Sequence, residues 1–181
     1  MDLSTVEKCL ADVEFEVRAR AADLAGELKM TQLAARLVEL LRDASARVRL
    51  FAAISLGKLQ YAAATDPLLS LLAETAENDP ALRHGAVLGL AGCASLEVLA
   101  GQSAHPSPDA RIGAIVALRR LKSSLVTQFL KDSDPRVLLE AVRAIYDIPL
   151  YESYPAVAAL LESEKLEGNA LLRRALGAAL R

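Results

Sequence analysis

The chain has 181 residues, of which 53% are hydrophobic and 24% charged, and its formal net charge at pH 7 is −2. This composition excludes a disordered chain and fits one folded domain. The small net charge offers no basic patch for nucleic acid, and no apolar run reaches the about 18 residues that cross a bilayer. Aromatic residues make up only 4%, which favours packed helices over a sheet.

Start and stop signals divide the chain into paired helices. Ser4 and Glu7 have the spacing of a capping box at the start of the first predicted helix. The later pairs begin at a capping residue or a proline, which stand at Thr31, Asp66, Ser95, Ser123 or Ser124, and Pro155. The predicted helical hairpins cover about residues 4–28, 31–59, 66–93, 95–121, 123–148 and 155–181.

The second helix of the first five hairpins carries one apolar pattern. Its first apolar residue, which we name the anchor, is Val17, Val48, Leu82, Ala110 or Val137. Four residues later an alanine always stands: Ala21, Ala52, Ala86, Ala114 and Ala141. Apolar residues also stand eight residues after the anchor (Ala25, Leu56, Leu90, Leu118, Ile145) and eleven after it (Leu28, Leu59, Cys93, Leu121, Ile148). These four positions share one helix face, so we expect them to be buried.

Residues that can cap a helix stand three positions before each anchor: Ser45, Asp79, Ser107 and Asp134, with Glu14 as the weakest case. A two-helix unit cannot bury its apolar face alone, so the hairpins must stack. The sequence therefore predicts an all-α, right-handed α-solenoid of about six helical hairpins, as a single domain over residues 1–181. The last predicted helix, Gly168–Arg181, is apolar to its end, and we expect the chain to be a fragment of a longer protein.

The pattern of Val48, Arg49, Ala52, Leu56 and Gly57 resembles the second helix of a HEAT repeat, most closely the short-repeat variety of phycobilisome-lyase-like proteins. This resemblance implies a non-catalytic scaffold that binds another protein or a neighbouring domain. It also leaves open an enzyme of the bilin lyase kind, against which the scarcity of aromatic residues counts.

A narrower resemblance links residues 78–92, 107–121 and 129–149 to the HEAT segment of large planctomycete-type proteins, described as membrane-bound dehydrogenases with a sugar-dehydrogenase-like propeller and a c-type haem domain. This resemblance implies an accessory helical domain outside the cytoplasm. The chain itself has no Cys-x-x-Cys-His motif, so we expect no cofactor in it.

Titratable residues do not form a catalytic or metal-binding pattern. His84 and His105 are the two histidines, and no carboxylate or thiolate stands at ligand spacing from them. Cys9 and Cys93 are far apart in sequence, and we expect free thiols. We therefore predict no catalytic, cofactor or metal site.

Arginine recurs one residue after the anchor in four hairpins: Arg18, Arg49, Arg83 and Arg111. The repeated position predicts a ladder along the stack, which could bind anions. The alternative, which we favour, is that the arginines pair with acids near the preceding turns (Asp12, Asp43, Glu77 and Asp79) and link the repeats.

Two further positions, two and six residues after the anchor, point away from the hairpin core. From the second hairpin on they hold a mainly apolar row: Leu50, Ile54, His84, Leu88, Ile112, Val116, Leu139 and Arg143. The row predicts either filling of the seams between repeats or a concave groove that docks a partner, with seam filling favoured. We expect a monomer.

Overall fold

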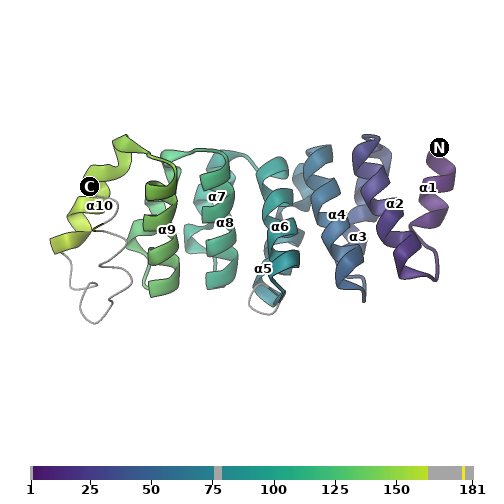
Figure 1. Ribbon diagram of the computed structural model, residues 1–181, viewed down its shortest axis with the longest axis horizontal. Coiled ribbons are helices and arrows are strands. Elements are labelled where there is room, and N and C mark those ends of the chain that lie inside the picture. The colour runs from purple at the N-terminus through teal and green to yellow at the C-terminus, as the bar shows by residue number, and fades with distance from the viewer. Residues whose placement is uncertain (1, 76–78, 163–176, 178–181) are drawn as a thin grey trace. The chain divides into compact units, whose positions relative to one another are not determined.

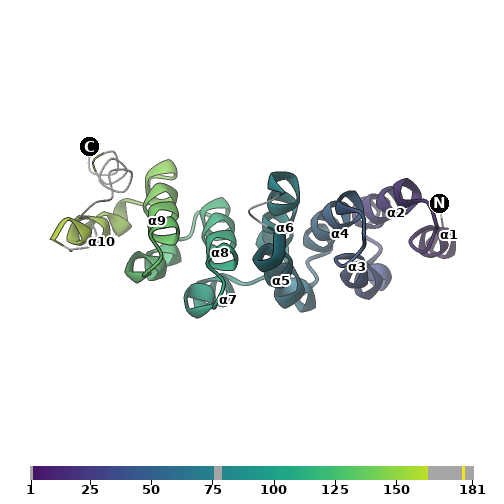
Figure 2. The same cartoon turned by 90° about the horizontal axis from the view of Figure 1, so that it is seen from below.

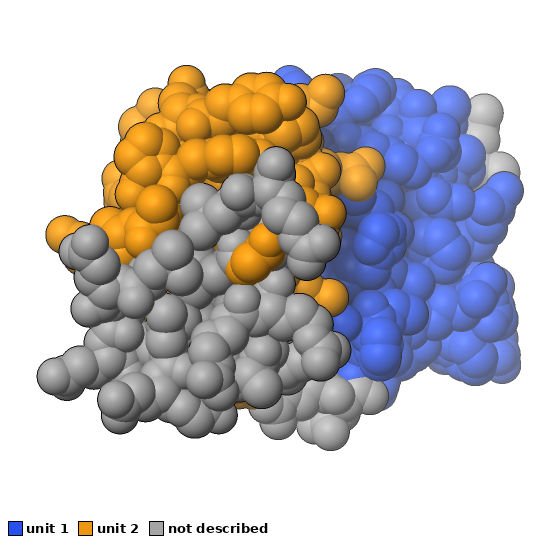
Figure 3. Space-filling view, turned by 60° about the vertical axis from the view of Figure 1, so that its left-hand side comes forward, with its two compact units in different colours: residues 1–94 blue, residues 95–181 orange. Residues whose placement is uncertain are grey.

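The computed structural model describes residues 2–75, 79–162 and 177, and every regular element among them is a helix, as predicted. The residues form two compact units, residues 1–94 (unit 1) and 95–181 (unit 2), which Figure 3 colours separately. Each unit is built from helical hairpins of the predicted kind (Figure 1).

Unit 1 contains three hairpins. The first pairs α1 (Leu3–Cys9) with α2 (Phe15–Glu27), and the second pairs α3 (Ala34–Leu40) with α4 (Ala46–Leu59). The third pairs α5 (Thr65–Thr75) with α6 (Pro80–Cys93). Within this unit the second helices α2, α4 and α6 lie side by side in one row. The first helices α1, α3 and α5 form a second row against them (Figure 2).

Unit 2 continues the pattern with shorter first helices. The fourth hairpin pairs α7 (Leu96–Gly101) with α8 (Pro108–Arg120). In the fifth, α9 (Pro135–Asp147) packs on a 3₁₀ helix over Ser124–Lys131, where the sequence predicted an α-helix. After α9 come α10 (Tyr154–Ala158) and a 3₁₀ helix over Ala159–Glu162. The predicted helix at 168–181 lies outside the described residues, except for Gly177.

The predicted core positions are confirmed where two hairpins flank the helix. The residues four and eight positions after the anchor are buried in all five second helices. The anchor is fully covered except in the first hairpin, where Val17 is 37% exposed. The prediction for the eleventh position is wrong at Leu28 and Leu121, which are 49% and 39% exposed. Each is the C-cap residue that follows its helix, whereas Leu59 and Cys93 at the same position still belong to theirs.

Predicted caps are confirmed where the side chain reaches a free backbone N–H of the first turn. Asp79, Ser95, Ser107, Ser123 and Asp134 each accept such a hydrogen bond. The Ser4 capping box is wrong: the N-cap of α1 is Asp2, two residues earlier, and its side chain accepts the hydrogen bond from the Thr5 N–H. Ser45 and Glu14 form no side-chain cap.

Three of the second helices, α2, α4 and α8, share an ending that the sequence analysis missed. Twelve residues after the anchor, Lys29, Gln60 and Lys122 adopt the left-handed conformation with φ of 54–55°. The N–H of the following residue then donates to a carbonyl five positions back, as in Tyr61 to Leu56. This is a Schellman ending, which glycine usually makes. Because no glycine stands at these positions, the amino-acid sequence gives no obvious signal for this ending.

Small residues bring the second helices of unit 1 into backbone contact. A Cβ on Gly89 would lie 2.6 Å from the Ala53 carbonyl oxygen, and one on Gly92 would lie 2.7 Å from the Gly57 Cα. Between α2 and α4, a Cβ on Gly26 would lie 2.7 Å from the Ser55 Cβ. These glycines therefore set the spacing of the repeats, since any larger side chain must push two backbones apart.

Ser55→Ala is expected to stabilise the chain by about 1 kcal/mol, because the buried Ser55 hydroxyl has no hydrogen-bond partner and alanine removes that cost. Chemical denaturation followed by circular dichroism measures the change. The exposed Ser70→Ala serves as the control and should be neutral. A Ser55→Ala protein less stable than its parent would show that the hydroxyl is satisfied.

Candidate functional site

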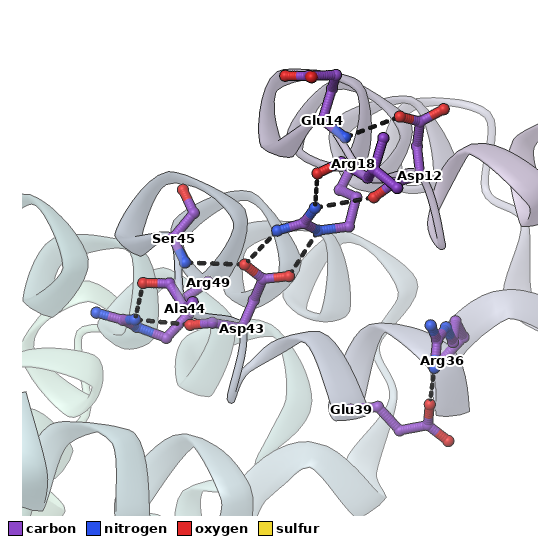
Figure 4. Close-up of polar contacts among 10 residues, drawn as sticks. Asp12, Glu14, Arg18, Arg36, Glu39, Asp43, Ala44, Ser45 and Arg49 are labelled. Atoms are coloured by element: carbon purple, nitrogen blue, oxygen red, sulfur yellow. Dashed lines mark hydrogen bonds and ion pairs between the residues drawn. The ribbon is translucent and has the colours of Figure 1, made fainter.

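Two arginines of the predicted ladder, Arg18 and Arg111, join neighbouring hairpins through their turns. Arg18 Nε and Nη2 donate to the two carboxylate oxygens of Asp43, at 2.7 and 2.9 Å. Arg18 Nη1 donates to the backbone carbonyls of Asp12 and Val13. Figure 4 shows the guanidinium held between the turn of its own hairpin and the turn of the next one. The arginine thus binds two turns at once.

The same arrangement recurs in unit 2. Arg111 Nε and Nη2 donate to the Asp132 carboxylate at 2.7 and 3.0 Å, and Arg111 Nη1 donates to the His105 carbonyl at 2.7 Å. Arg111 and Asp132 are largely buried, with side chains 11% and 5% exposed. Two independent copies of one geometry show that this is a repeated junction.

The other two arginines make fewer contacts. Arg49 Nη1 donates to the carbonyls of Asp43 and Ala44, whereas its buried Nε has no partner. Glu77, which occupies the position equivalent to Asp43 in the next turn, lies outside the described residues. Arg83 is exposed. Asp79, another predicted partner, instead caps α6 through the Leu82 N–H.

Each junction uses the acid of the following turn, and this differs from the predicted pairing with the preceding turn. Asp12 offers Arg18 its backbone carbonyl and not its carboxylate, and Asp132 was not among the predicted partners. A sequence signal exists, because Asp12, Asp43 and Asp132 all stand five residues before an anchor. The carboxylate of each aspartate also accepts a hydrogen bond from the backbone N–H of the residue two positions later in the chain, which fixes the turn.

Stability should depend on pH through Asp43. The hydrogen bonds from the Arg18 guanidinium hold the pKa of the Asp43 carboxyl below its usual value of about 4. The pair therefore stabilises the fold at neutral pH, and this contribution is lost as the pH falls through the lowered pKa. Asp43→Asn should lower stability at pH 7 and flatten its loss below pH about 4 in denaturation curves. An unchanged acid profile would contradict the pairing.

The apolar row lies half-buried along the second helices. Leu50, Ile54, Leu88, Ile112, Val116 and Leu139 are of intermediate exposure, while His84 and Arg143 are exposed. A Cβ on Gly85 would contact the side chains of Leu50 and Ile54, so these two lie partly in the seam between α4 and α6. Their remaining surface, with that of Leu88, faces outward.

Charged pairs bridge the second helices. In unit 1, Arg47 pairs with Glu16 at 3.0 Å and also lies 5.3 Å from the centre of the Phe51 ring. Lys58 pairs with both Asp23 and Glu27 across the α2–α4 seam. In unit 2, Arg119 pairs with Glu140 and Asp147 of α9. Because these pairs are partly exposed, each contributes little to stability.

Surface depressions lie between helices in the described part of unit 1. The first, of about 270 Å³, lies between α1 and α2 and is lined by Val6, Cys9, Val17, Ala21 and Leu24, with Glu16 and Arg20 at its edge. The second, of about 220 Å³, lies between α3 and α5 and is lined by Val38, Leu41 and Leu71 together with Glu39, Arg42 and Glu74.

The other titratable residues considered in the sequence analysis are the histidines and the cysteines. His105 Nδ1 accepts the Ser107 N–H and so occupies the turn position that aspartate holds elsewhere. Both cysteines are free, and burial raises the pKa of the Cys93 thiol to about 11. Among the described residues no group of three or more His, Cys, Asp or Glu could hold a metal ion, and no helix could cross a membrane.

Comparison with known proteins relates the N-terminal part of the chain to a repeat family. Residues 3–91 match the family described as HEAT repeats. No curated protein matches the sequence. Among solved structures, an engineered protein is 17% identical with a TM-score of 0.48, the similarity covering 99% of this chain and 96% of that one. The Escherichia coli protein YibA is 16% identical with a TM-score of 0.43, covering 97% and 80%. Likenesses this distant indicate no function.

Proposed function

We propose that this chain, a HEAT repeat protein over residues 3–91, is a non-catalytic module that binds another protein or a neighbouring domain through its second helices. HEAT repeats typically form protein-binding scaffolds. One observation carries the proposal for this surface: Leu50, Ile54 and Leu88 are apolar but only half-buried, so α4 and α6 present an apolar strip to solvent.

The strip has a chemistry suited to a protein partner. An apolar strip that spans neighbouring helices usually has a partner, because leaving it in water costs free energy in proportion to its area. The exposed His84 lies beside it on α6, and the Arg47–Glu16 pair offers polar contacts at its edge. Apolar centres with polar edges are the usual anatomy of protein interfaces.

Site-specific photo-crosslinking in cells tests the proposal. A photoreactive amino acid in place of His84 should capture one defined protein, while the same amino acid at Gln32, exposed beside α3, should not. Leu88→Asp should reduce the crosslink at position 84 about tenfold, and Ala63→Asp, at an exposed position before α5, should leave it intact. Equal capture at positions 84 and 32 would contradict the proposed surface.

Circular dichroism must show that the Leu88→Asp protein remains folded, because the residue is half-buried. We expect retained helicity and a melting temperature reduced by a few degrees. A complete loss of helicity would mean that Leu88 belongs to the packed seam between second helices. The strip would then be part of the core and would offer no surface to a partner.

A further inference from the structure

We draw no further inference here: the strongest candidate, the depression of about 220 Å³ between α3 and α5, carries none, because its lining holds both acidic residues (Glu39 and Glu74) and a basic one (Arg42), which favours no class of partner, and nothing in the structure shows what covers it.

Discussion

Gly92→Ala is expected to lower the free energy of unfolding by about 2 kcal/mol, even though alanine gains about 1 kcal/mol over glycine in a helix. The reason is the close approach of α6 to α4. A Cβ at position 92 would lie 2.7 Å from both the Cα and the carbonyl carbon of Gly57. These are backbone atoms, which cannot rotate away as a side chain could. Urea denaturation followed by circular dichroism measures the change.

Gly101→Ala is the matched control for this prediction. Gly101 closes α7 with helical dihedral angles, and a Cβ there would meet nothing within 4 Å. This variant should therefore be as stable as the parent or slightly more stable. If the two alanine variants had equal stabilities, the second helices of unit 1 could not be in backbone contact.

Leu56→Ala is expected to cost about 2–5 kcal/mol, the usual range for a large-to-small change in a core. Leu56 stands eight residues after its anchor, is fully buried on α4 and lies between the first and third hairpins of unit 1. Leu118→Ala, at the same position of α8, should behave alike in unit 2.

Leu28→Ala tests whether the effect follows burial or merely the loss of a leucine. Leu28 is also apolar and also belongs to the repeated pattern, but it is 49% exposed. We expect it to cost less than about 1 kcal/mol. Thermal melts of the Leu56→Ala, Leu118→Ala and Leu28→Ala proteins, compared with the parent, give their order of stability. A Leu28→Ala protein as unstable as Leu56→Ala would mean that another surface covers α2 in solution.

The candidate sites could be anticipated only in part. The positions of Arg18 and Arg111 follow from their spacing to the anchors, but their partners do not. Arg18 lies nearer in sequence to Asp12 than to Asp43, yet its guanidinium binds the carboxylate 25 residues away. The choice depends on how two hairpins stack. Close contacts between neighbouring second helices set the distance between the turns of the two hairpins. The residue spacing within one helix gives no information about that distance.

The paired helices, their alanine position and the buried residues eight positions after each anchor could be predicted without any structure. This information is local, because one apolar face with a 3.6-residue period appears within each segment. The difference in exposure between Val17 and Val48, which hold the same position of the repeat, became visible only in the packed fold. A pattern tells which face of a helix is apolar. Whether that face is covered depends on the neighbouring hairpin: α4 packs against α2, whereas Val17 of α2 lines a surface depression.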